Sequence, residues 1–82
     1  MRLDKYLKVS RLIKRRTVAG EACGSGRVSV NGRAAKSAYE VKLNDVIEIS
    51  FGGKTLKVKV AGLKEYVKKD EAGAMYEVLE EG

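Results

Sequence analysis

Apolar side chains in the first part of the chain recur with the spacing of an α-helix. Leu3, Tyr6 and Leu7 fall on one face at steps of three and four residues, and charged side chains occupy the opposite face. This pattern predicts a short amphipathic helix over residues 3–9. The apolar pair at residues 12–13 is placed to anchor the following turn to the core.

A second, less regular helix is predicted over residues 17–24. Gly20 and Gly24 lie within it, and each lowers the intrinsic helix stability by roughly 1 kcal/mol relative to alanine. Packing against the rest of the protein must therefore hold this helix in place. Gly26 is suited to end it. Cys23 lies on its apolar stripe, and we expect it to be a small core residue.

From residue 27 onward the apolar positions change to strict alternation, which is typical of half-buried strands. Pairs of turn-forming residues separate the alternating runs. Asn-Gly at 31–32 is the strongest of these signals, because both residues accept a positive φ. The polar segment 63–73 predicts a loop or one helical turn. The predicted strands are residues 28–30, 33–36, 47–51, 56–60 and 75–79, with turns at 31–32, 44–45 and 52–53.

This order of elements predicts an α+β fold. Two short N-terminal helices would pack on a small, mainly antiparallel sheet. We expect residues 1–82 to form a single domain, because 82 residues are fewer than a typical domain contains. A domain of this size buries only about 60–65% of the surface of its unfolded chain, so little room remains for a deep catalytic pocket.

The charge of the chain is concentrated in its first part. The formal net charge is +6. Residues 1–36 hold ten Lys or Arg and two acidic residues, a net charge of +8, whereas residues 37–82 hold seven basic and nine acidic residues, a net charge of −2. Such polarity is typical of proteins that bind nucleic acid, although a solvated basic surface would also produce it.

Several kinds of chemistry have no basis in the sequence. Histidine is absent, which removes the usual general base and the commonest metal ligand. One cysteine without histidine cannot build an ordinary zinc site. Gly24-Ser25-Gly26 resembles part of a dinucleotide motif but does not follow a strand, so we interpret it as a helix end. We therefore expect no enzymatic activity, no metal and no cofactor.

Membranes and DNA are less favoured partners than RNA. The chain has no apolar run of the roughly 18–20 residues that span a bilayer, and the apolar face of the first helix is narrow. With its single cysteine, the protein is expected to be cytoplasmic. A DNA reader of the helix-turn-helix type would have a longer recognition helix, whereas residues 17–24 offer mostly small side chains.

The turn between the two predicted helices concentrates three cations, Lys14, Arg15 and Arg16, at one corner. A bent phosphate backbone suits such a corner, since arginine holds phosphate bidentately or stacks on a splayed base. The helix dipole disfavours Arg15 and Arg16 at a helix N-terminus, which either a bound phosphate or simple solvent exposure explains. We expect an RNA surface formed by the first helix, this corner and Arg27.

Several motifs together resemble the S4 RNA-binding domain. They are the run at residues 1–7, the basic turn at 14–16 and the run Gly-Arg-Val-Ser-Val-Asn-Gly at 26–32. Residues 41–45 are similar to the Val-Lys-x-Gly-Asp turn of the family, with Asn44 where glycine is usual. The resemblance implies the αL-type S4 fold, with a core motif over about 1–51 and C-terminal strands and a turn over 52–82.

Residues 2–17 and the tail at 68–76 resemble one subgroup more closely, the RqcP family of free-standing S4 proteins, to which the heat-shock S4 protein is related. This resemblance implies binding to large ribosomal subunits that peptidyl-tRNA obstructs, with contacts to 23S rRNA and to the tRNA. It also implies support of RqcH, which adds C-terminal alanine tails to stalled nascent chains. We expect the protein to act as a monomer.

The resemblance also assigns roles to particular residues. Arg16 matches the key RNA-contacting arginine of the family, and Arg2 and Asp4 lie in its N-terminal motif. Asp4 would either cap the first helix or orient a neighbouring arginine. Many S4 domains have Ser or Thr at Arg15, so the start of the second helix is not fixed by the sequence. The full set of expected RNA-binding residues is Arg2, Asp4, Lys5, Lys8, Arg11, Lys14, Arg15, Arg16 and Arg27.

Three other functions stay open at this point. A general rRNA-binding or ribosome-assembly protein would have nearly the same sequence features. A DNA-binding regulator is a weaker alternative, and an RNA-modifying enzyme is weaker still, because no catalytic domain follows the S4 motif.

Gly20 and Gly24 are unusual in the second helix, and we expect them to leave it mobile until RNA binds.

Overall fold

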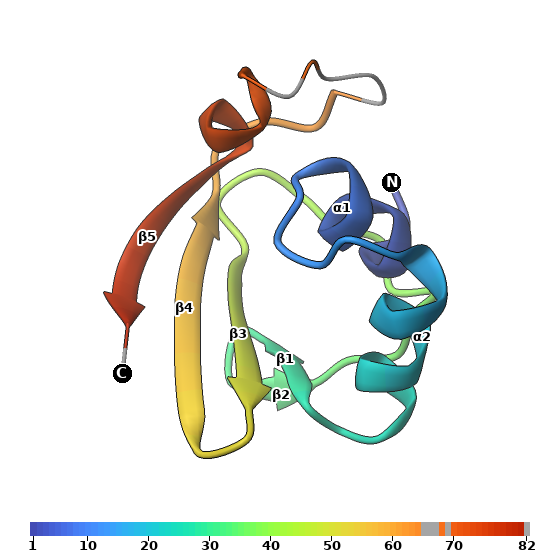
Figure 1. Cartoon of the computed structure of the whole chain (residues 1–82). Coiled ribbons are helices and arrows are strands. Elements are labelled where there is room, and N and C mark those ends of the chain that lie inside the picture. Colours follow the sequence, from blue (N-terminus) through green and yellow to red (C-terminus); the bar gives the residue numbers. More distant parts are fainter. Residues whose placement is uncertain (65–67, 69, 82) are drawn as a thin grey trace.

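The computed structural model describes residues 1–64, 68 and 70–81. Two α-helices come first, and five strands and one short 3-10 helix follow (Figure 1). The helices are α1 (Leu3–Val9), α2 (Arg16–Gly24) and the 3-10 helix η1 (Ala72–Met75). The strands are β1 (Val28–Val30), β2 (Arg33–Ala34), β3 (Val46–Phe51), β4 (Lys54–Val60) and β5 (Tyr76–Glu81).

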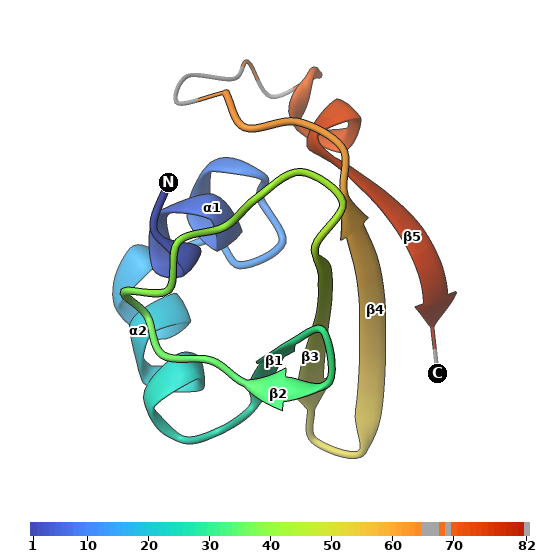
Figure 2. The same cartoon turned by 180° about the vertical axis from the view of Figure 1, so that it is seen from behind.

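All five strands belong to one sheet with the order β2-β1-β3-β4-β5, and each neighbouring pair is antiparallel. Figures 1 and 2 show α1 and α2 together on one side of the molecule, with β5 at the far edge of the sheet. The predicted α+β class, with two N-terminal helices on an antiparallel sheet, is confirmed.

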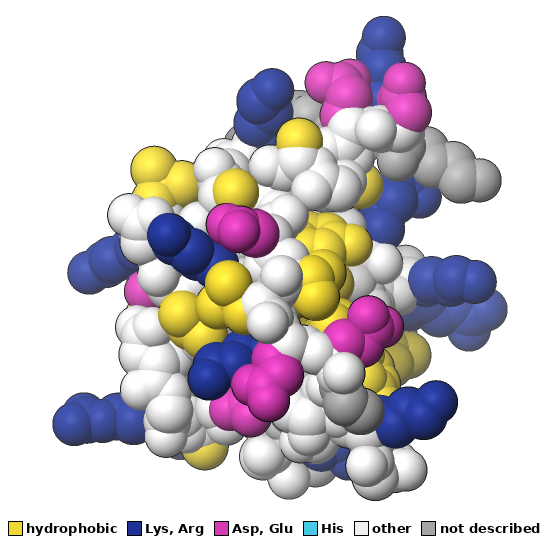
Figure 3. Space-filling view, turned by 90° about the vertical axis from the view of Figure 1, so that its left-hand side faces the viewer, with side chains coloured by type: hydrophobic (Ala, Val, Ile, Leu, Met, Phe, Trp, Pro, Cys, Tyr) yellow, Lys and Arg dark blue, Asp and Glu magenta, His cyan; other side chains and the backbone are white. Residues whose placement is uncertain are grey.

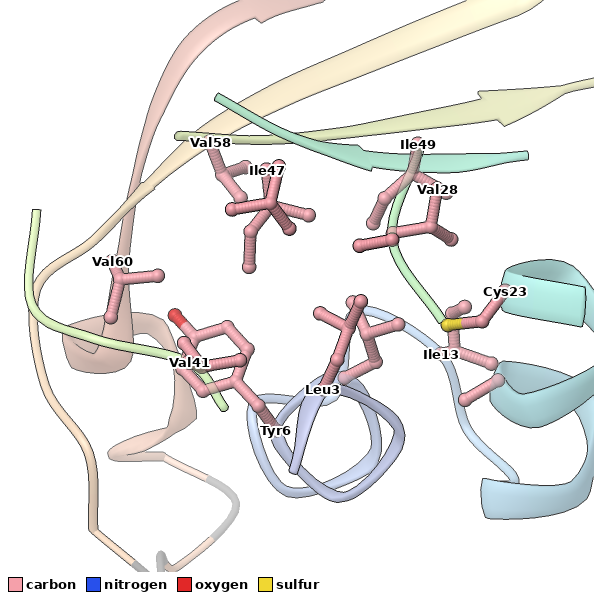
Figure 4. Packing of buried hydrophobic residues seen from close by; sticks show 14 of the residues in the cluster. Leu3, Tyr6, Ile13, Cys23, Val28, Val41, Ile47, Ile49, Val58 and Val60 are labelled. Carbon is pink, nitrogen blue, oxygen red and sulfur yellow. The ribbon is translucent and has the colours of Figure 1, made fainter. Parts of the chain in front are cut away.

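Alternation along the strands sends one set of side chains into the core. Ile47, Ile49 and Val58 are fully buried, and Val60 is 1% exposed. Figure 4 shows these side chains pointing from the sheet toward α1, with Cys23 of α2 at one end of the same cluster. The hydrophobic cluster therefore joins both helices to the sheet.

The opposite face of the sheet carries charges of both signs in register. Glu48 of β3 lies beside Lys57 of β4, and Lys57 lies beside Glu80 of β5. Lys59 and Glu77 form a further cross-strand pair. Opposite charges on neighbouring strands attract each other, and the view from the β5 side shows basic and acidic side chains interspersed (Figure 3). This part of the surface offers no uniformly positive field.

The turns explain two features of the sequence. Asn31 and Gly32 both have positive φ angles, 53° and 83°, as the predicted Asn-Gly hairpin between β1 and β2 requires. Asn44 has a φ of 73°. Asparagine is the residue after glycine that tolerates this left-handed region best. Asn44 can therefore stand where the family usually has glycine without losing the turn.

Element boundaries differ from the sequence predictions at several elements. Strand β3 begins at Val46 instead of residue 47, β4 begins at Lys54 instead of residue 56, and β5 spans Tyr76–Glu81 instead of 75–79. The predicted strand 33–36 ends at Ala34, because the chain leaves the sheet to reach the start of α1. Helix α2 begins at Arg16, one residue earlier than predicted, with Arg15 as its N-cap. Within the predicted loop 63–73, residues 65–67 and 69 lie outside the described residues, and a 3-10 helix begins at Ala72.

Asp45 connects the turn between β1 and β2 to the segment between β2 and β3. Its side chain accepts hydrogen bonds from the Asn31 amide at 3.1 Å, the Tyr39 hydroxyl at 3.0 Å and the Lys42 backbone N–H at 2.9 Å. Asp45 is only 8% exposed. Burial by itself would raise the pKa of Asp45, but the hydrogen bonds from Lys42, Asn31 and Tyr39 outweigh burial and lower the pKa below its usual value.

We expect Asp45→Asn to lower the free energy of unfolding at neutral pH by roughly 1–3 kcal/mol, because at least one partly buried donor loses its acceptor. The lowered pKa means that Asp45 contributes stability above its unfolded pKa. That contribution disappears as the pH falls through the folded pKa. Urea unfolding from pH 7 to pH 2 should show the two proteins converging below about pH 4. An equal difference at every pH would contradict a role for the carboxylate charge.

Candidate RNA-binding surface

The structure places the expected RNA-binding residues on the helical side of the protein. Lys5 and Lys8 belong to α1, Arg11 and Lys14 lie in the turn after it, and Arg15 and Arg16 begin α2. Arg27 stands apart, immediately before β1. The exposed members of the set are Arg2, Lys8, Arg11, Lys14, Arg15, Arg16 and Arg27, whereas Lys5 is half-buried and Asp4 is buried.

Asp4 joins two arginines that are distant in sequence. Arg2 points its Nε at Asp4 Oδ1, 3.3 Å away, and its Nη2 at Asp4 Oδ2, 3.4 Å away. On the other side, Arg16 Nε forms an ion pair with Asp4 Oδ2 at 3.4 Å. The Asp4 side chain is 10% exposed, while those of Arg2 and Arg16 are 52% and 50% exposed. One buried carboxylate therefore pairs with two guanidinium groups whose side chains are half exposed.

The start of α1 explains why Asp4 is available for this task. Arg2 is the N-cap, and its side chain makes no capping hydrogen bond. Instead, the backbone N–H groups of Leu3 and Asp4 donate to the carbonyl groups of Tyr39 and Ser37. The Asp4 carboxylate also accepts the backbone N–H of the next residue, Lys5, at 2.8 Å. Asp4 is therefore not the N-cap of α1, so the capping interpretation is wrong, whereas its ion pairs with Arg2 and Arg16 agree with the interpretation that it orients a neighbouring arginine.

The turn after α1 directs its cations outward by burying its apolar residues. Arg11 adopts the left-handed conformation, with a φ of 63°, and its N–H donates to the Lys8 carbonyl. The Ile13 N–H then donates to the Leu7 carbonyl, and the Ile13 side chain is only 7% exposed. The expectation that residues 12–13 anchor this turn is confirmed by their place in the core cluster. Lys14 and Arg15 follow and are exposed.

Arg27 and Lys14 lie on a feature that the sequence did not indicate. Both line a hollow of about 440 Å³ between α2 and the end of β3, together with Phe51 and Val18. The sequence predicts Phe51 only as the last residue of an alternating strand. Its position at the last residue of β3, directly before Gly-Gly, was the available signal that the helices would not cover it.

Other groups on the helices offer no reactive chemistry. Cys23 is 4% exposed, as expected for a core residue. Burial, together with the negative charge of Asp4, raises the pKa of the Cys23 thiol, which disfavours the nucleophilic thiolate. Among the described residues, no group of three or more Cys, Asp or Glu is arranged to hold a metal ion, and no helix is long and apolar enough to cross a membrane.

Gly20 and Gly24 have no packing reason to be glycine. A Cβ atom added at either position would meet nothing within 4 Å. The open space means that no close approach of neighbouring atoms requires glycine here. The expectation that both residues leave α2 mobile before RNA binds stays a prediction.

The scan against protein families matches residues 1–47 to the S4 domain. The chain belongs to the S4 domain family. The match covers α1, the basic turn, α2 and the first three strands up to Ile47. It therefore includes Arg2, Asp4 and Arg16, which together form the Asp4 cluster. The S4 resemblance and the S4-type fold expected from the sequence are therefore confirmed.

Curated relatives are similar over nearly the whole chain. The RQC P-site tRNA stabilizing factor of Streptococcus pneumoniae is 58% identical over 81 residues, which are 99% of this chain and 92% of that protein. The protein of the same name from Halalkalibacterium halodurans is 54% identical over 81 residues, which are 99% of this chain and 92% of that protein. The chain is thus an S4 domain protein that is similar to these two factors over nearly its whole length.

A solved structure supports the same placement. The trimeric structure of Vibrio cholerae Heat Shock Protein 15 superposes with a TM-score of 0.89 and 26% identity, covering 96% of this chain and 81% of that chain. The expected relation to the heat-shock S4 protein is confirmed. The neighbour is described as a trimer, so the monomer expected from the sequence stays a prediction for this chain.

The Asp4 cluster leads to a prediction in which charge and geometry give opposite results. Asp4→Asn raises the formal net charge from +6 to +7, and charge alone would then strengthen RNA binding. We expect affinity for large ribosomal subunits to fall by about tenfold instead, because Arg2 and Arg16 lose the carboxylate that orients them.

The matched control is Asp70→Asn, which makes the same chemical change at an exposed residue outside the candidate surface. Affinity can be measured by sedimentation with purified subunits at fixed salt. If Asp4→Asn and Asp70→Asn strengthened binding equally, the positioning role of Asp4 would be wrong.

Proposed function

We propose that this protein is a non-enzymatic cytoplasmic factor that binds 23S rRNA and tRNA on large ribosomal subunits obstructed by peptidyl-tRNA. In this role it supports RqcH in adding alanine tails to stalled nascent chains. The observation that carries the proposal is the 58% identity, over 99% of the chain, to a protein named RQC P-site tRNA stabilizing factor. That name concerns the relative, and the proposal extends it to this chain.

The candidate surface supports this function physically. Arg2 and Arg16 each keep guanidinium donors free for phosphate while Asp4 holds them in place, so less side-chain freedom is lost when RNA binds. Exposed Lys8, Arg11 and Lys14 extend the positive charge around the same corner. The mixed charges on the outer face of the sheet leave the helical side as the favoured face for a polyanion.

We expect Arg16→Ala to weaken binding to large subunits by about tenfold or more, since it removes both a charge and an aligned donor pair. The slope of log affinity against log salt should become shallower by about 1, the value for one lost phosphate contact. Arg16→Lys should keep the salt slope but still lose affinity, because an ammonium group lacks the planar fork.

Arg33→Ala is the matched control for the Arg16 variants, because Arg33 is an exposed arginine of β2 outside the candidate surface. A salt series for all three variants and the natural protein decides the question. Arg16 does not contact RNA if its alanine variant keeps the affinity and slope of the natural protein.

The cellular role needs a separate test. We expect deletion of the gene to reduce alanine tails on stalled chains, measured by mass spectrometry of peptidyl-tRNA products, and the natural gene to restore them. Arg33→Ala should also restore them, whereas Arg16→Ala should not. In sucrose gradients the protein should sediment with large subunits that carry peptidyl-tRNA.

Two results would favour the alternatives. Sedimentation with immature particles, with tails unchanged in the deletion strain, would indicate a ribosome-assembly role. Stronger binding to duplex DNA than to structured RNA at matched salt would indicate a DNA-binding regulator.

A further inference from the structure

Phe51, at the end of β3, is much more exposed than the other apolar residues on its face of the strand. It is the only phenylalanine of the chain, and it shares a sheet face with the fully buried Ile47 and Ile49. Yet Phe51 is 44% exposed, because β3 runs past the side chains that cover the other two. An aromatic ring left open beside a hollow is available to stack on a flat partner.

The hollow beside Phe51 has apolar walls from three parts of the chain. Leu12 and Ile13 come from the turn after α1, Val18 comes from α2, and Ile49 precedes Phe51 in β3. Val18 is itself 46% exposed. The volume of about 440 Å³ lies within the range of roughly 300–1,000 Å³ that small-ligand sites occupy.

Charged side chains complete the lining of the hollow. Lys14 lies two residues before α2 and Arg27 three residues after it, and both are exposed. Lys14 lies two residues before Arg16, so the turn before α2 connects the hollow to the residue that pairs with Asp4. A strand of RNA that follows this surface would pass the hollow, with cations at both ends of α2 to hold its phosphates.

We propose that this hollow binds one unpaired nucleotide of the RNA. The base stacks on Phe51 and packs against Val18, while Lys14 and Arg27 hold the flanking phosphates. The proposal rests on the proposed function, since it assumes that the helical side binds RNA. It assigns Phe51 a specificity role: it lets the protein distinguish RNA with an unstacked base from fully paired RNA.

Glu21 favours a base over a bare phosphate as the occupant. It is the one acidic residue of the lining. A carboxylate repels phosphate but accepts hydrogen bonds from the amino and imino groups on base edges. Apolar walls, two cations and one carboxylate together match the apolar faces, the phosphates and the donor edge of a nucleotide.

The test compares Phe51→Ala, Phe51→Leu and Phe51→Tyr in binding to large ribosomal subunits and to two model RNAs. One RNA is a stem with an unpaired loop, and the other is the same length of uninterrupted duplex. We expect Phe51→Ala and Phe51→Leu to lose about 5- to 140-fold in affinity for subunits and looped RNA, the range for one lost base stack. Phe51→Tyr should stay within about twofold, because it keeps an aromatic face.

Leu79→Ala is the matched control, because Leu79 is an exposed apolar residue of β5, 47% exposed, and does not line the hollow. It should bind as the natural protein does. Ultraviolet crosslinking of the natural protein to looped RNA, followed by peptide mass spectrometry, should place a crosslink at Phe51. The salt slope of the Phe51 variants should be unchanged, which separates stacking from the charge loss in Arg16→Ala.

Several outcomes overturn the proposal. It is wrong if Phe51→Leu binds looped RNA as well as Phe51→Tyr does, or if all variants lose equal affinity for looped and duplex RNA. It is also wrong if the Phe51 variants abolish tailing in cells while subunit binding is unchanged, since a protein would then occupy the hollow. In each case Arg16→Ala still reports on the proposed function: if it weakens subunit binding while Phe51→Ala does not, only the nucleotide pocket is wrong.

Discussion

Tyr6 connects α1 to the sheet and to Met75 at the end of η1. Its side chain is fully buried between α1 and the sheet, and its hydroxyl donates to the Met75 carbonyl at 2.7 Å. A buried polar group that loses its partner costs about 1–3 kcal/mol, so this bond fixes the rotation of α1 as well as its depth. The N–H groups of Leu3 and Asp4 add two further constraints through the carbonyls of Tyr39 and Ser37.

Because α1 is fixed, the Asp4 carboxylate has a fixed position at its first turn. Arg2 and Arg16 converge on it from two elements, and their mutual repulsion is offset by the one negative charge between them. The remaining cations of the helices need no such partner to stay hydrated at the surface. The core thus places the carboxylate, and the carboxylate arranges the two arginines.

The sequence predicted the elements where local signals were strong. Helical spacing of Leu3, Tyr6 and Leu7 gave the bounds of α1, and alternation gave β3 and β4 to within two residues. Predictions were weaker where tertiary contacts decide the boundary. Strand β2 stops at Ala34 because the chain turns toward α1, and α2 begins at Arg16 without a side-chain cap that could mark its start.

By itself, the sequence determined the polarity of this protein, its order of elements and the cationic corner at 14–16. These properties follow from local periodicity and from charges that are counted along the chain. Only the tertiary structure decided that Asp4 pairs with Arg16, and that Phe51, Lys14 and Arg27 line the same hollow. Such meetings depend on the angle at which α1 and α2 dock on the sheet, which the packing of the whole core sets.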